Sequence, residues 1–77
     1  MSRLKNLRKE KGYSQLNVQM KTGIDQSAYS KMELGTRNLS FQNCQILALL
    51  FDTSMDYLAG LTDEKSPYPR AENVIEM

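Results

Sequence analysis

The chain has 77 residues and a formal net charge of +1, and 40% of its residues are hydrophobic. We expect a single small domain, because this length leaves no room for a second folded module. One cysteine and no histidine exclude a disulfide scaffold and a zinc site. The chain contains no run of about 18 apolar residues, and its N-terminal segment is charged. We therefore expect a cytoplasmic protein without a membrane span.

The charges are distributed unevenly along the chain. Residues 1–40 carry eight basic and three acidic side chains, a net charge of +5, whereas residues 41–77 carry two basic and six acidic ones, a net charge of −4. This asymmetry is typical of a protein that sets one basic face against phosphates, although a chance gradient would give the same numbers.

The sequence predicts helices and no strands in residues 1–62. The first helix runs from about Ser2 to Lys11, with Leu4 and Leu7 on one face. Ser14 caps a second helix, which covers about Gln15–Thr22. Residues 63–77 contain two prolines and many charges, so we expect them to form an extended tail.

Two residues predict a sharp start for the third helix, about Gln26–Leu34. Gly23 has no Cβ and can therefore adopt the left-handed conformation that ends the preceding helix. Asp25 can accept hydrogen bonds from the first free amides of the third helix and places a negative charge at its positive end. Two short helices joined in this way form a helix-turn-helix layout.

The third helix has an apolar inner face and a polar outer face. Tyr29 and Met32 are three residues apart and therefore share the inner face. An outer face with amide, hydroxyl and ammonium groups can pair with base edges in the major groove of DNA. The predicted base-reading residues are Gln26, Ser27, Ser30 and Lys31.

These residues also carry a resemblance to a family. Gln15–Met32 resembles the helix-turn-helix of the phage-repressor and Cro type, also called the XRE type. The likeness continues through Leu7–Ser14, Gly35–Phe41 and Ser54–Gly60. It implies an all-α, compact five-helix bundle, similar to the lambda repressor's DNA-binding domain. It further implies an ion pair between Arg8 and Glu33 that ties the first helix to the third.

Four residues of the second helix depart from that family pattern, one of them Thr22, which replaces a larger aliphatic residue. Relatives usually have a small residue where this chain has Gln19, because the two motif helices cross closely there. A glutamine must bend its stem aside or hold the helices apart. Leu16 and Met20 are apolar where relatives are mostly charged. They are either scattered surface hydrophobes or contacts for apolar residues near the C-terminus: Val74, Ile75 and Met77.

The stretch before the fourth helix is a candidate phosphate site. Ser40 caps a helix of about Phe41–Phe51, and the free amides of Ser40 and Phe41 attract an anion beside Arg37. Phosphate contacts fix the register of a protein on DNA without reading its sequence. The predicted phosphate-contacting residues are Gln15, Arg37, Asn38, Ser40 and Phe41.

The fourth helix is apolar on two sides. The stripe expected to face the first three helices consists of Phe41, Cys44, Leu47, Ala48 and Phe51. A second stripe has little in so small a domain to cover it, which suggests the interface of a twofold dimer, unless the fifth helix and the tail lie over it. The predicted interface residues are Ile46, Leu49, Leu50 and Tyr57.

Together these features predict a sequence-specific double-stranded DNA-binding protein. We expect a small transcriptional regulator, acting as a repressor and as a homodimer on a palindromic operator, and encoded by a bacterium or phage. The alternative is an antitoxin or another protein-interaction module with the same fold. We expect no enzymatic activity, because no catalytic arrangement or glycine-rich phosphate loop is present. We also expect no cofactor, metal or small-molecule effector.

Overall fold

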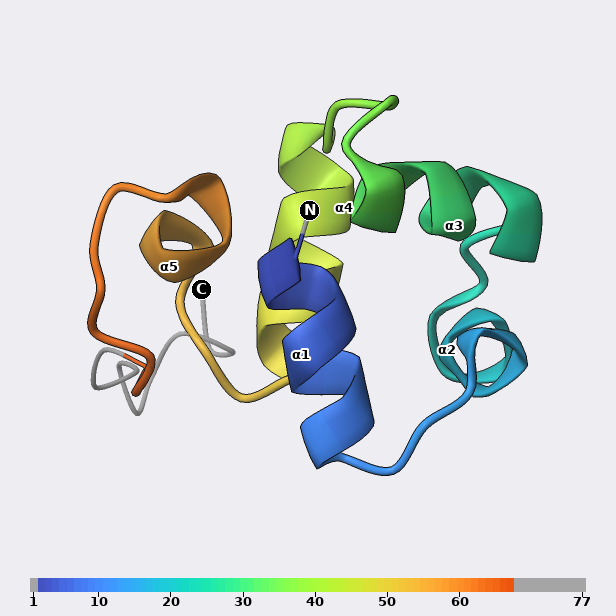
Figure 1. Ribbon diagram of the computed structural model, residues 1–77, viewed down its shortest axis with the longest axis horizontal. Helices are drawn as coiled ribbons and strands as arrows, with labels where there is room; N and C mark the ends of the chain where they lie inside the picture. Colours follow the sequence, from blue (N-terminus) through green and yellow to red (C-terminus); the bar gives the residue numbers. More distant parts are fainter. Residues whose placement is uncertain (1, 68–77) are drawn as a thin grey trace, which may run out of the picture.

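The protein is an all-α bundle, as predicted. The computed structural model describes residues 2–67, and this part of the chain contains five helices and no strand (Figure 1). The helices are α1 (Ser2–Glu10), α2 (Gln15–Thr22), α3 (Gln26–Leu34), α4 (Phe41–Leu50) and α5 (Met55–Ala59). Within the described residues, no helix is long and apolar enough to cross a membrane.

Polar side chains begin the helices and glycines end several of them. The hydroxyls of three serines each accept a hydrogen bond from the backbone amide three residues further on: Ser14, Ser40 and Ser54. Gly23 ends α2 with a φ of 79°, and its N–H donates to the carbonyl of Gln19. A Cβ on Gly23 would meet nothing within 4 Å, so the positive φ favours glycine here and crowding does not.

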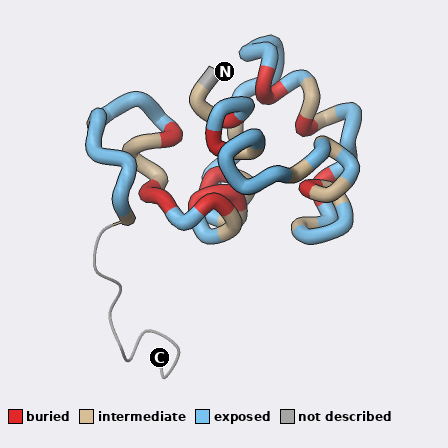
Figure 2. Tube along the Cα trace, turned by 60° about the horizontal axis from the view of Figure 1, so that its bottom comes forward, coloured by how far each residue is buried: buried red, intermediate tan, exposed pale blue. Residues whose placement is uncertain are grey.

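The helices pack around one core. α2 packs against α3 and α4, α1 packs against α3, and α5 packs against α4 on the side of the molecule opposite α2 and α3 (Figure 1). Buried residues line the inner sides of the elements (Figure 2). The buried apolar side chains are Leu4, Leu7, Val18, Ile24, Tyr29, Met32, Cys44, Leu47, Ala48, Phe51 and Leu58. Cys44 therefore acts as a small hydrophobe, and burial raises the pKa of its thiol.

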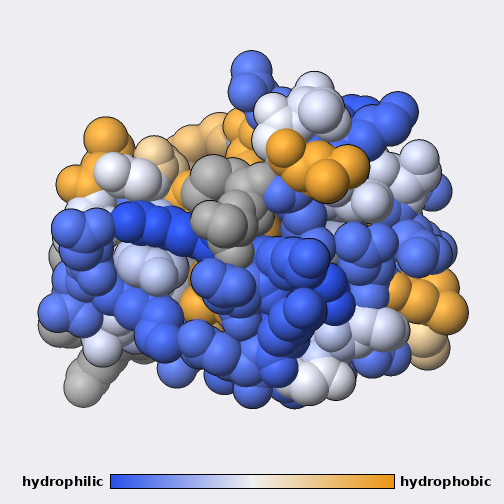
Figure 3. Space-filling model, viewed as in Figure 1, coloured by the Kyte–Doolittle hydropathy of each residue, from blue (hydrophilic) through white to orange (hydrophobic). Residues whose placement is uncertain are grey.

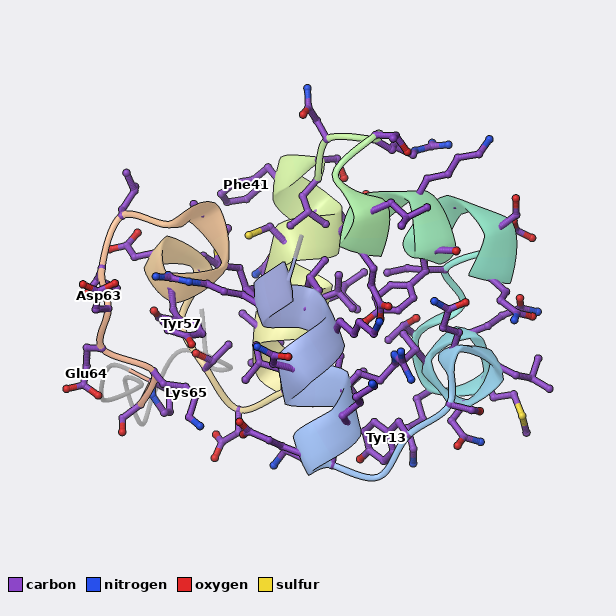
Figure 4. All side chains as sticks on the ribbon, viewed as in Figure 1. Tyr13, Phe41, Tyr57, Asp63, Glu64 and Lys65 are labelled. Atoms are coloured by element: carbon purple, nitrogen blue, oxygen red, sulfur yellow. The ribbon has the colours of Figure 1, made fainter. Side chains whose placement is uncertain are left out.

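The prediction that Phe41 belongs to the core was wrong. Phe41 is the first residue of α4, and it is 75% exposed. It lies one turn before Cys44, beside a groove between the α3–α4 loop and α5 that Met55 and Ala59 also line. Figure 4 shows its ring pointing from the start of α4 toward α5. Helical spacing placed Phe41 on the buried face, but the neighbouring helices do not extend over the first turn of α4.

The second apolar stripe of α4 is partly covered. Ile46 and Leu50 are half-buried and pack against the core, as does Tyr57 of α5. Leu49 is 57% exposed, so it is the residue through which this stripe reaches the surface.

The chain after α5 folds back toward α1. The guanidinium of Arg3 donates to the backbone carbonyls of Tyr57 (2.6 Å) and Thr62 (2.8 Å) and pairs with the carboxylate of Asp63 at 2.8 Å. It also lies 4.3 Å from the centre of the Tyr57 ring. One side chain of α1 thus holds α5 and the segment after it.

Two further contacts hold the described start of the predicted tail, residues 63–67. Lys65 pairs with Glu10 of α1 at 3.0 Å, and its carbonyl accepts a hydrogen bond of 2.5 Å from the hydroxyl of Thr53. Thr53 is buried, so this bond satisfies a polar group that water cannot reach. Figure 4 shows Asp63, Glu64 and Lys65 in the segment that follows α5. The predicted contacts of Val74, Ile75 and Met77 lie outside the described residues.

Candidate nucleic-acid interface

Side chains close the N-terminus of α3. The carboxylate of Asp25 accepts hydrogen bonds from the amides of Ser27 (3.0 Å) and Ala28 (3.3 Å). Oε1 of Gln19 accepts one from the amide of Gln26 at 2.7 Å. These three amides are ones that a helix cannot satisfy by itself, and here all have protein acceptors. Because the Asp25 carboxylate also repels phosphate, α3 must meet an anionic ligand with its side chains.

The outer face of α3 offers such side chains. Three of the predicted base-reading residues, Gln26, Ser27 and Lys31, are exposed, and Ser30 is half-buried. The opposite face is buried and holds Tyr29, Met32 and Glu33. In the described part of the chain, no protein group bonds to the side chain of any of the four, so their donors and acceptors are free for a ligand.

The N-termini of α2 and α4 differ from that of α3. Each is capped by a neutral serine, and neither has an acidic residue in its first turn. At α4, the backbone amides of Ser40 and Phe41 have no acceptor within residues 2–67. Arg37, Asn38 and Ser40 are exposed in the loop before it. A helix start with free amides, a positive dipole end and a neighbouring arginine attracts phosphate.

The remaining predicted phosphate contact, Gln15, takes part in a second interaction. Its Nε2 donates to Oε1 of Glu33 at 3.1 Å, which uses one of its two amide protons. The other proton and the backbone amide at the start of α2 have no acceptor in the described residues. Gln15 therefore links the start of α2 to α3 while keeping a donor for a phosphate.

An ion pair fixes α3 against α1. Nε of Arg8 donates to Oε2 of Glu33 at 2.6 Å, and Nη2 donates to Oε1 at 3.2 Å. The two side chains are only 12% and 5% exposed. Arg8 also donates to the carbonyl of Tyr13 at 3.0 Å, so the pair additionally holds the α1–α2 loop. The two-pronged geometry sets the rotation of α3 as well as its distance from α1.

The surroundings of the pair keep both partners charged. Burial alone would raise the pKa of Glu33, but the hydrogen bonds around its carboxylate and the charge of Arg8 lower that pKa below its usual value. The hydrogen bond from Arg8 to Glu33 raises the pKa of Arg8. The hydroxyl of Tyr29 lies buried beside the pair without a hydrogen bond of good geometry, and burial raises the pKa of this phenol.

Apolar patches interrupt an otherwise hydrophilic side of the molecule. Figure 3 shows mainly hydrophilic surface on the face it presents, with a hydrophobic patch at the right edge over α2. Leu16 and Met20 are the exposed apolar residues of α2, at 49% and 74%. Among the described residues, therefore, Leu16 is only about half covered and Met20 is mostly uncovered.

The amino-acid sequence is similar to those of known proteins. A family model described as "Helix-turn-helix" matches residues 4–58. Two relatives from Bacillus subtilis (strain 168) are the HTH-type transcriptional regulator AnsR, 38% identical over 71 residues, and the uncharacterized HTH-type transcriptional regulator YobD, 35% identical over 74. These matches cover 92% and 96% of this chain but 61% and 66% of the relatives, so the chain spans a little under two thirds of their length. No solved structure matches the chain significantly.

We expect the Glu33→Gln variant to be less stable than the wild-type chain by on the order of 3 kcal/mol at neutral pH, because Arg8 loses its buried counter-charge. The pKa of Glu33 is lower in the folded chain than in the unfolded one. The stabilisation is therefore complete above about pH 4.3 and is lost as the pH falls through the folded-state pKa. Urea unfolding of both proteins between about pH 7 and pH 2.5 measures this difference.

The exposed carboxylate of Glu64 provides a control, because Glu64→Gln removes an acid outside the ion pair. This variant should follow the wild-type stability curve. Equal stability of the wild type and Glu33→Gln at neutral pH, or a difference that persists unchanged in acid, would contradict the role assigned to the pair.

Proposed function

Because this chain belongs to the helix-turn-helix family of the XRE type, we propose that it binds double-stranded DNA sequence-specifically and regulates transcription. The observation that carries the proposal is the outer face of α3, where four polar side chains have no partner in the described residues. Two flanking helix starts with free amides support it, because they suit the phosphates on either side of a groove.

The proposed complex places α3 in the major groove. A major groove admits one α-helix, and its base edges present distinct patterns of donors and acceptors. In this arrangement, Gln26 pairs with an adenine and Lys31 reaches O6 and N7 of a guanine, while Ser27 and Ser30 bond to nearby bases or phosphates. Each good paired contact discriminates against the wrong base by roughly 1–3 kcal/mol.

The proposed phosphate contacts surround that helix. On one side the start of α2 offers Gln15, and on the other the loop before α4 offers Arg37 and Asn38 together with the amides of Ser40 and Phe41. These groups contribute affinity and fix the register of α3, but they carry no sequence information.

We further propose that the protein acts as a homodimer and a repressor. One domain makes too few base contacts for selective binding, and a twofold dimer doubles them on a palindromic operator with half-sites about 10 bp apart. The proposed interface is the surface around Leu49, with Ile46, Leu50 and Tyr57 behind it.

Two substitutions separate base contacts from phosphate contacts. Lys31→Ala should lower affinity for the selected operator more than for random duplex, by roughly 1–3 kcal/mol, because it removes a base contact. Arg37→Ala should weaken both alike and reduce the slope of log K against log salt by about 0.9, because it removes a phosphate contact. Fluorescence anisotropy at several salt concentrations measures the affinity and the salt slope of the wild type and of each variant on both duplexes.

Lys5→Ala is the matched control, since it removes one exposed positive charge from α1, outside the proposed interface. It should leave the salt slope unchanged. Equal losses on both duplexes for Lys31→Ala would remove Lys31 from the base-reading set.

The oligomeric state tests the proposed interface. We expect light scattering to show a dimer of the wild-type chain at micromolar concentration and a monomer of Leu49→Glu, because the substitution places a charge on the exposed residue of the stripe. Leu16→Glu is the matched control, because Leu16 is similarly exposed on α2, and it should remain dimeric. A monomeric wild-type chain would favour a different protein as the partner, as in an antitoxin.

A further inference from the structure

We propose that Gln19 is a positioning residue for base recognition: it holds both ends of the α2–α3 turn and thereby fixes the direction in which Gln26 leaves the recognition helix. The inference rests on the proposed DNA binding and adds a residue that acts through another residue.

The first step is the pair of hydrogen bonds that Gln19 makes. Its backbone carbonyl accepts from the amide of Gly23 at 2.7 Å, which closes α2. Its side-chain Oε1 accepts from the amide of Gln26 at 2.7 Å, which opens α3. Gln19 therefore bonds to the chain on both sides of the α2–α3 turn. Its side-chain carboxamide fixes the distance between the end of α2 and the start of α3.

The second step is that no other group in the described residues holds the first amide of α3. Asp25 caps the helix, but its carboxylate accepts from Ser27 and Ala28 and leaves Gln26 out. Without the oxygen of Gln19, the amide of Gln26 would have no protein acceptor. Water alone would then satisfy this exposed amide, and the backbone of Gln26, the first residue of α3, would be held less firmly.

Other contacts hold the rest of the turn. Ile24 is buried at 8% exposure and anchors the turn in the core. The hydroxyl of Thr22 donates to the carbonyl of Val18 at 2.7 Å and accepts from the amide of Ile24 at 3.1 Å. Because these contacts hold the centre of the turn, the hydrogen bond from the side chain of Gln19 sets the position of Gln26, the residue after the Asp25 cap.

The consequence concerns the accuracy of base reading. A carboxamide that makes two hydrogen bonds to one base must approach it in plane, and small displacements of its backbone break one of them. A frayed first turn would still allow Gln26 to reach the groove, but in many orientations. Losing the bond from Gln19 should therefore reduce discrimination at one base pair and leave the phosphate contacts intact.

The test uses the full chain and the operator selected from random duplexes. The base pair that Gln26 reads is identified as the one at which Gln26→Ala lowers the preference most. Gln19→Met keeps the bulk of the side chain but removes the oxygen, and Gln19→Glu keeps an acceptor oxygen. Affinities are measured by anisotropy for the operator, for a duplex altered at that base pair, and for random duplex.

We expect Gln19→Met to reduce the preference at that base pair about tenfold, while affinity for random duplex and the salt slope stay at the wild-type values. Gln19→Glu should retain the preference, although its charge lowers affinity for all duplexes alike. In a Gln26→Ala background, Gln19→Met should have no further effect at that base pair, because its effect passes through Gln26. Exchange of the Gln26 amide proton should be faster in Gln19→Met than in the wild type.

Three outcomes would overturn the proposal. A wild-type preference in folded Gln19→Met would leave Gln19 with a structural role only. An equal loss in Gln19→Glu and Gln19→Met would show that the acceptor oxygen does not matter. An undiminished effect of Gln19→Met in the Gln26→Ala background would show direct action. Should Gln19→Met fail to fold, Gln19→Ala replaces it in each comparison. If the proposed DNA binding itself were wrong, the wild-type chain would show no preference among the duplexes, which distinguishes that result from the three outcomes above.

Discussion

A buried ion pair between Arg8 and Glu33 fixes the recognition helix against the first helix. It joins the first helix to the end of α3, and both side chains are almost fully buried. A buried charge pair is favourable only in one geometry, so it specifies the rotation of α3 about its own axis. That rotation decides which side chains face outward. The bond from Gln15 to Glu33 extends the same control to the start of α2.

The N-termini of α2, α3 and α4 are capped differently. Asp25 and Gln19 close the start of α3, so this helix presents side chains and no free first-turn amides at that end. The starts of α2 and α4 keep neutral serine caps and free amides. In the proposed complex, the starts of α2 and α4 attract phosphate, whereas the acidic cap of α3 repels it. The pattern arises because the cap of α3 is a charged aspartate, whereas the caps of α2 and α4 are neutral serines.

Much of this arrangement could be predicted from the sequence, because capping residues and glycines act locally. The serine caps, Gly23 and Asp25 predict the helix boundaries to within about one residue. Contacts over longer distances could not be predicted in the same way. The spacing of Phe41 indicates the core, but burial depends on where neighbouring helices end. Gln19 was an exception to the family pattern without an assigned role, since the position of its oxygen depends on the turn that it bridges. The hydrogen bonds of Arg3 to the chain after α5 join residues about 60 positions apart, and no local pattern indicates them.

The proposed DNA binding requires the outer face of α3 to lie against base pairs. Its most direct test is an NMR titration of the labelled chain with the selected operator duplex at low and at high salt. We predict amide shifts that are concentrated from Gln26 to Lys31 and around Ser40 and Phe41, and that weaken as salt rises. Saturating duplex that leaves the amides of Gln26 to Lys31 unmoved would contradict it.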